Sequence, residues 1–166
     1  MATGTILIPI LSGVFDGTAP PSVGFSTAGR PYLAFDQATD ELIVYSFRMP
    51  ENYASALVAK IIWSGSTSTT ATHTATWSVE VMATTPETDS VANDTDSFDT
   101  ANTADDDILG TTAKRPQLVS ITLTNADSVA AGDYVAIRLS RDANAANDDL
   151  TEDAWVWAFS LEYTTT

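Results

Sequence analysis

The sequence has 166 residues, of which 22 are acidic and 7 basic, with one histidine and no cysteine. The lack of cysteine excludes disulfides, thiolate metal sites and a cysteine nucleophile. A formal net charge of −15 argues against nucleic acids and anionic membranes as partners, because binding to phosphate rests on Lys and Arg. The length and the 44% hydrophobic content are typical of one domain with a hydrophobic core.

The beginning of the sequence predicts an extended arm. No basic segment follows Met1, and the apolar run 6–11 is interrupted by Pro9. The run is therefore too short for a signal peptide or a spanning helix, and we expect a protein assembled in the cytosol. Residues 12–30 are rich in Gly, Pro, Ser and Thr, which is typical of irregular structure. We divide the chain into an N-terminal arm, 1–30, and a single β-sandwich domain, 31–166.

Apolar and polar residues alternate in short runs along the chain, a pattern that indicates β-strands. In the clearest run, the inward-facing positions would be Trp155, Trp157, Phe159, Leu161 and Tyr163. Similar runs occupy residues 5–11, 32–35, 41–49, 57–63, 77–83, 119–123 and 135–139. No stretch of ten residues has a convincing helical stripe. The sequence predicts an all-β fold, an antiparallel jelly-roll β-sandwich of about eight strands, which we favour over a closed barrel.

Residues 84–114 form a predicted acidic loop with eight acidic residues and no basic one before Lys114. Loops of this length are usually functional or disordered. Asp94, Asp96 and Asp99 are weak calcium candidates, since calcium prefers clustered oxygen ligands. However, Asp99 occupies the position where an EF-hand loop needs glycine, and loop aspartates commonly accept hydrogen bonds from turns. We favour turn-forming carboxylates and predict neither a metal nor a cofactor.

The sequence contains no convincing catalytic group. His73 is the only histidine, it lies in a Ser/Thr-rich connection, and no Gly-x-Ser-x-Gly motif accompanies it. Glu80 falls on the polar side of its strand, without the burial that a glycosidase acid needs. We therefore predict that the protein is not an enzyme. Arg138, on the polar side of its own strand, is expected to pair with a carboxylate of a neighbouring strand.

The tryptophans have two possible uses. Aromatic faces stack on sugar rings, and jelly rolls include many lectins. Trp77, Trp155 and Trp157 fall on predicted inward-facing positions, however, which favours packing in the core. A glycan-binding module would have to expose at least one tryptophan.

Three segments of the sequence carry a resemblance to a known group of proteins. They are the region 35–53, which ends in FRMPENY, the motif WSVE at 77–80, and AGDYVAIRLSRD at 131–142. Over roughly residues 32–163 the chain resembles small virion proteins of tailed phages, in particular their capsid decoration, or cement, proteins.

This resemblance implies a trimeric jelly-roll protein without catalytic activity. Assembled in the host cytoplasm, it would sit on the outer capsid surface of the virion and bind the major capsid protein. By bridging capsid subunits it would stabilise the expanded shell. The alternatives are a phage fibre or spike head and a glycan-binding jelly-roll module.

A contact surface for the capsid or another subunit is predicted in the N-terminal arm. Exposure of an apolar, nearly uncharged arm to water is unfavourable, and exposed apolar surface often marks a contact site. We therefore assign this contact to Ile6, Ile8, Ile10 and Phe15. The other interpretation of residues 6–11 is an ordinary strand of the sandwich.

Overall fold

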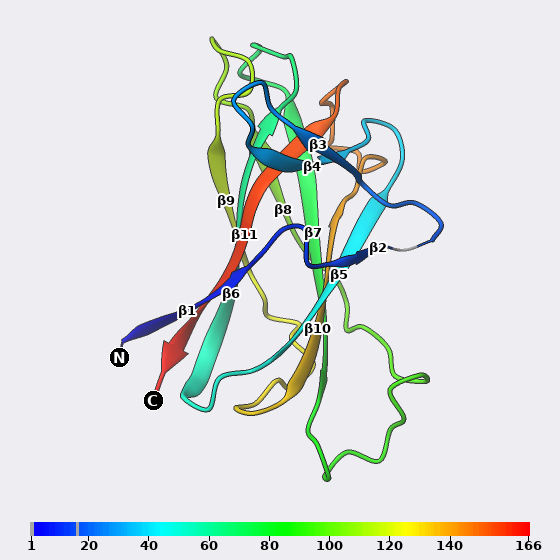
Figure 1. Cartoon of the computed structure of the whole chain (residues 1–166), viewed down its shortest axis with the longest axis vertical. Coiled ribbons are helices and arrows are strands. Elements are labelled where there is room, and N and C mark those ends of the chain that lie inside the picture. Colours follow the sequence, from blue (N-terminus) through cyan, green and yellow to red (C-terminus); the bar gives the residue numbers. More distant parts are fainter. Residues whose placement is uncertain (1, 16) are drawn as a thin grey trace.

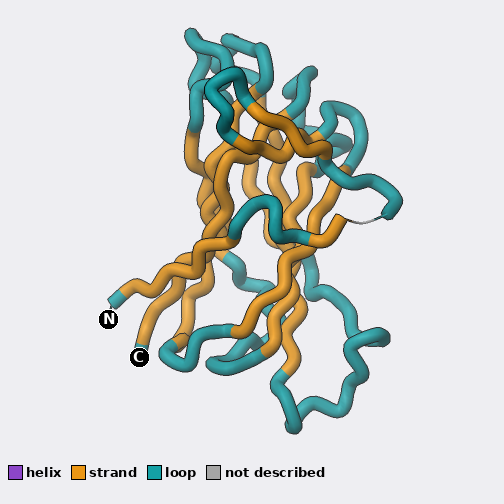
Figure 2. Tube along the Cα trace, in the orientation of Figure 1, coloured by secondary structure: helices purple, strands orange, loops and turns teal. Residues whose placement is uncertain are grey.

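The computed structural model of the chain describes residues 2–15 and 17–166, and all regular structure within them is β-strand. Figures 1 and 2 show the strands stacked as two layers, with the two chain ends close together. Both layers are antiparallel sheets. The all-β prediction is therefore confirmed.

The first sheet has the order β3-β4-β11-β6-β9, and β1 also pairs with β11. Its strands are β1 (Thr3–Ile8), β3 (Ser22–Phe25), β4 (Pro31–Phe35), β6 (Tyr53–Gly65), β9 (Gln117–Thr122) and β11 (Ala154–Thr165). The second sheet has the order β2-β5-β10-β7-β8. Its strands are β2 (Val14–Phe15), β5 (Glu41–Arg48), β7 (Thr74–Thr84), β8 (Asn102–Asp107) and β10 (Tyr134–Arg141).

The strands β4 to β11 pair in a nested order that defines a jelly roll. β7 pairs with β8, β6 with β9, β5 with β10 and β4 with β11. This is the pairing of one long hairpin that has been folded over into two sheets, which is how a jelly roll closes its core. The predicted jelly-roll sandwich is confirmed, and its eight strands are β4 to β11.

The segment predicted as an arm contributes strands to both sheets. β1 pairs with β11, β2 with β5, and β3 with β4. Ile8 and Ile10 are only 7% and 8% exposed, because they pack into the core of their own chain. β4 pairs only with the first residues of β11, and β1 pairs with the rest of that edge. By pairing there, the apolar segment gains backbone hydrogen bonds and buries apolar surface.

The predicted acidic loop 84–114 also contains a strand, β8. Its sequence, Asn-Thr-Ala-Asp-Asp-Asp, has almost no apolar alternation, so periodicity could not reveal it. Polar side chains hold it instead: the hydroxyls of Thr74 and Thr76 on β7 donate to Asp107 and Asp105, at 2.5 and 2.7 Å. Residues 85–101 remain a loop, which extends away from the sandwich after β7 (Figure 1).

The core lies between the two sheets and contains Trp63 and Trp77, both fully buried. On the outer side of the second sheet, Arg138 meets Glu80 of β7 at 2.7 Å. The two residues are directly opposite each other in the register of β10 and β7. The predicted pairing of Arg138 with a carboxylate on a neighbouring strand is confirmed.

Candidate ligand-binding groove

A β-bulge in β11 decides where its tryptophans point. Opposite β6, Val156 pairs with Trp63 and Ala158 with Ile62, so Trp157 is an extra residue without a partner. A bulge of one residue reverses the side-chain alternation of its strand. Val156 and Phe159 are therefore both buried, although three positions separate them. Trp157, between them, lies on the outer face of the sheet and is only partly buried.

The prediction that Trp155 and Trp157 pack in the core is thus wrong, whereas the prediction for Trp77 is confirmed. The alternation rule assumes uninterrupted pairing. It assigns Phe159, Leu161 and Tyr163 correctly, but it fails on the other side of the bulge. In the corrected register Ala154 and Val156 face the core.

The outward-facing tryptophans form an aromatic cluster with Tyr32 of β4. Tyr32 stacks on Trp155 with a centroid distance of 4.0 Å and an interplanar angle of 11°. Trp157 contacts both rings edge-on, at 5.3 and 5.8 Å. Its Nε1 donates to the Oγ of the buried Ser64, at 2.9 Å. These contacts hold the Trp157 ring in one orientation.

Gly24 of β3 makes room for this cluster. It pairs with Tyr32 in the register, and a Cβ atom at this position would overlap the Tyr32 ring. Only glycine lets the tyrosine lie across the edge strand. An aromatic side chain that covers a glycine on an edge strand also protects the exposed backbone there.

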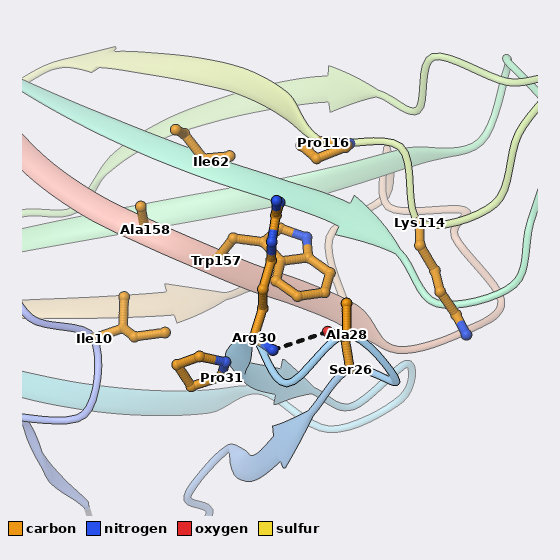
Figure 3. Close-up of a pocket in the computed structure, with 10 residues that line it drawn as sticks. All are labelled: Ile10, Ser26, Ala28, Arg30, Pro31, Ile62, Lys114, Pro116, Trp157 and Ala158. Carbon is orange, nitrogen blue, oxygen red and sulfur yellow. Dashed lines mark hydrogen bonds between the residues drawn. The ribbon is translucent and has the colours of Figure 1, made fainter.

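Trp157 lines a groove of about 680 Å³ on the outer face of the first sheet, a volume within the range of small-molecule sites. Figure 3 shows its walls: the β3–β4 turn on one side and the segment before β9 on the other. The lining residues are Ile10, Ser26, Ala28, Arg30, Pro31, Ile62, Lys114, Pro116, Trp157 and Ala158.

The two cations of the groove come from its two walls (Figure 3). Arg30 ends the β3–β4 turn, in which its backbone N–H donates to Ser26 Oγ at 3.0 Å. Gly29 precedes it with a φ of 78°, a conformation that favours glycine. On the opposite wall, Lys114 Nζ lies 4.9 Å from the centre of the Trp155 ring, a cation–π contact.

The structure does not gather the calcium candidates into a site. Asp96 and Asp99 accept hydrogen bonds from the N–H groups of the residues that follow them, at 2.9 and 2.7 Å, and Asp94 is exposed. Within residues 2–15 and 17–166, no three His, Cys, Asp or Glu side chains are grouped closely enough to hold a metal ion.

His73 is half-buried, and its Nδ1 lies 3.1 Å from Ser68 Oγ. In the part of the chain that the structure describes, no carboxylate forms a hydrogen bond to its ring, so it lacks the orienting group of a catalytic triad. That the protein is not an enzyme stays a prediction.

The predicted contact residues of the arm are mostly turned inward. Besides Ile8 and Ile10, Ile6 packs against the core, while Phe15 is 39% exposed. The large apolar side chain that β1 exposes is Leu7, at 80%. That this segment contacts a capsid or another subunit stays a prediction.

No protein-family model matches the sequence, and no curated protein sequence matches it. Several solved structures are similar. The mosquito-larvicidal Cry4Aa toxin from Bacillus thuringiensis aligns with a TM-score of 0.56 and 13% identity, over 99% of this chain and 24% of the toxin. An isomalto-dextranase from Arthrobacter globiformis, complexed with panose, aligns with a TM-score of 0.53 and 16% identity, over 95% of this chain and 23% of the enzyme.

The xylan-binding module CBM15 aligns with a TM-score of 0.49 and 12% identity, over 99% of both chains. The chain spans about a quarter of the length of the toxin and of the isomalto-dextranase. The order and pairing of its strands define the protein as an all-β jelly-roll sandwich. No described residue belongs to a helix that is long and apolar enough to cross a membrane.

Proposed function

We propose that this protein is a non-catalytic glycan-binding module and that its ligand occupies the groove beside Trp157. The observation that carries the proposal is the bulge of β11, which turns Trp157 out of the core and into the groove. Indole rings offer the flat apolar face against which sugar rings pack. The same fold occurs in part of an isomalto-dextranase, an enzyme that was solved in complex with panose.

The site has the properties of a preformed sugar platform. The Trp155 ring stacks on Tyr32 and makes a cation–π contact with Lys114. Trp157 is the aromatic residue that lines the groove. Its contacts with Ser64 and the two neighbouring rings fix its orientation before a ligand arrives. A side chain that is already ordered loses little entropy on binding.

Replacing Trp157 by alanine is expected to weaken binding of the glycan about 30-fold, the size of an aromatic hot spot of roughly 2 kcal/mol. The wild-type protein would first be screened on an array of neutral and acidic glycans. The best ligand would then be titrated by calorimetry and by tryptophan fluorescence. A screen without any bound glycan, or equal affinity of Trp157→Ala, would contradict the proposal.

Two further variants make this test specific. Tyr134→Ala removes an aromatic side chain that is 41% exposed on β10 of the other sheet, and it should leave the affinity unchanged. Deletion of Trp157 removes the extra residue and restores regular pairing of β11 with β6. This variant should stay folded, because its core residues keep their positions, and should bind no glycan.

A second candidate, a structural virion protein that bridges capsid subunits, is favoured by a different observation. Leu7 and Leu118 are 80% and 55% exposed. Both line a hollow of about 290 Å³ on the first sheet, which the ion pair of Lys60 and Glu162 also lines. Apolar side chains this exposed are candidates for contact with another protein surface. The proposal here is a homotrimer that buries them, as the resemblance to decoration proteins implies.

The trimer can be tested by light scattering. The wild-type protein should have three times the 17.6 kDa mass of the chain, and Leu7→Lys should reduce it to one chain by placing a charge in the interface. Val14→Lys, at a side chain 72% exposed on the other sheet, is the control. A wild-type protein that stays monomeric at every concentration would contradict the trimer.

A further inference from the structure

The basic residues are distributed unevenly between ion pairs and the groove. Four of the seven form salt bridges: Arg48 with Glu51, Lys60 with Glu162, Arg138 with Glu80 and Arg141 with Asp148. Among the described residues, Arg30, Lys114 and Arg115 are the basic side chains without a salt bridge. Two of these three line the groove, and Arg115 lies between its lining residues Lys114 and Pro116.

This arrangement is unexpected on a protein with 22 acidic residues. No aspartate or glutamate lines the groove in the part of the chain that the structure describes. In an evenly mixed surface, most exposed cations would have a carboxylate within reach. Here two of the three cations without a salt bridge line a groove that also presents a tryptophan ring. An anion placed there would gain the attraction of both cations without displacing a carboxylate.

We propose that the groove selects acidic sugars, meaning pyranoses that carry a carboxylate or a sulfate group. This inference rests on the proposed glycan-binding function and names its ligand class. Trp157 would pack against the apolar face of the ring, while the guanidinium of Arg30 holds the anionic group with paired hydrogen bonds. Lys114 adds a point charge from the opposite wall.

The backbone at both cations is ordered, so the points from which the two side chains extend are defined. Arg30 closes a turn held by hydrogen bonds from Ser26 N to Arg30 O and from Gly29 N to Ser26 O, each of 2.8 Å. Lys114 has a φ of 62°, in the left-handed region that non-glycine residues seldom adopt. A rare backbone conformation beside a groove is typical of residues that are placed for binding.

The glycan array separates this inference from the function on which it rests. We expect the bound glycans to be predominantly acidic, with carboxylated and sulfated glycans as separate groups. If only neutral glycans bind, the glycan-binding function holds and the selectivity for acidic sugars is wrong. If no glycan binds, the proposed function fails, and the inference fails with it.

The role of Arg30 is then measured with the best acidic ligand and its matched neutral form, in which the carboxyl group is reduced or the sulfate removed. Arg30→Gln should weaken the acidic ligand by about 10- to 100-fold, the effect of losing a charged hydrogen bond, and the neutral form by less than twofold. Arg48→Gln, at an exposed but paired arginine, is the matched control.

Binding of the acidic ligand should also weaken as the NaCl concentration rises from 50 to 500 mM. Equal losses for both ligand forms, or a loss with Arg48→Gln as large as with Arg30→Gln, would overturn the proposal.

Discussion

Replacing Arg141 by methionine is expected to lower the free energy of unfolding by about 3–5 kcal/mol, the usual cost of removing one partner of a buried ion pair. The side chains of Arg141 and Asp148 are 0% and 1% exposed. The variant would leave the carboxylate of Asp148 buried without its cation. For a chain of this length, we expect the melting temperature to fall by about 10 °C.

Arg141 has this importance because it joins two connections at one end of the sandwich, the one between β4 and β5 and the one between β10 and β11. Its Nε and Nη2 donate to the two oxygens of Asp148, at 2.9 and 2.7 Å. Its remaining N–H groups donate to the carbonyl oxygens of Asp36, Leu150 and Glu152, at 3.2, 2.6 and 2.8 Å. The fork of the guanidinium has donors for all of these acceptors, which a lysine could not match.

The control is Arg138→Met, on the same strand. Its pair with Glu80 is partly exposed, at 32% and 23%, and such a pair contributes only about 0–1 kcal/mol. The double variant Arg141→Met with Asp148→Leu should recover part of the loss, since it removes the unpaired charge as well. Equal destabilisation by Arg141→Met and Arg138→Met in denaturant unfolding would contradict the prediction.

The destabilisation by Arg141→Met should also depend on pH. Burial raises the pKa of Glu41 and of Asp153, and the cation of Arg141 opposes this rise. Without the arginine, the pKa values of these two carboxyl groups should rise further in the folded variant, above those in its unfolded chain. Folding then takes up protons, so the variant gains stability as pH falls. Its deficit relative to the wild type should therefore shrink from pH 7 toward pH 4.

Replacing Trp77 by alanine is expected to cost about 3–5 kcal/mol, the range for removing a large aromatic side chain from a core. Trp77 is fully buried, and it contacts Phe35 and Trp63 edge-to-face, with centroid distances of 5.4 and 5.5 Å. Alanine would leave a cavity between the sheets that the surrounding strands can fill only in part. Urea unfolding, with a midpoint shifted at unchanged slope, measures the loss.

Phenylalanine at the two core tryptophans provides the sharper comparison. Trp63 Nε1 donates to Asp106 Oδ2 at 2.7 Å, whereas Trp77 Nε1 is buried without a hydrogen-bond partner among the described residues. Trp63→Phe therefore loses a hydrogen bond to a carboxylate, while Trp77→Phe removes a donor that was unsatisfied. We expect Trp63→Phe to be less stable than Trp77→Phe by about 1–3 kcal/mol. The opposite order would show that the loss of packing volume decides at these positions.

The fold was largely predictable because its strands carry regular alternation. The alternation predicts that Val135, Ile137 and Leu139 face the core, and all three are buried in β10. The strand β8 was missed because it has no apolar alternation, and its residues Asp105 and Asp107 accept hydrogen bonds from hydroxyl groups of β7 instead. Such a strand has no hydrophobic period for a sequence pattern to detect.

The sequence by itself determined the all-β class, the two-sheet jelly roll and the pairing of Arg138 with a carboxylate of a neighbouring strand. These follow from local alternation and charge, which each strand carries on its own. Only the tertiary structure decided which face of the sheet receives Trp155 and Trp157. The bulge exists between two strands, β11 and β6. The pairs on either side of it, Val156 with Trp63 and Ala158 with Ile62, join residues 93 and 96 positions apart in the sequence, so no short window of sequence contains both.

The convergence of Arg30 and Lys114 has the same origin. The first belongs to the β3–β4 turn and the second to the segment before β9, and they line one groove because β4, β11, β6 and β9 are successive neighbours in the first sheet. In the sequence they lie 84 positions apart, in a chain with 22 acidic residues. Sheet pairing over a long distance placed them beside Trp157, and that placement is what makes the groove a candidate site.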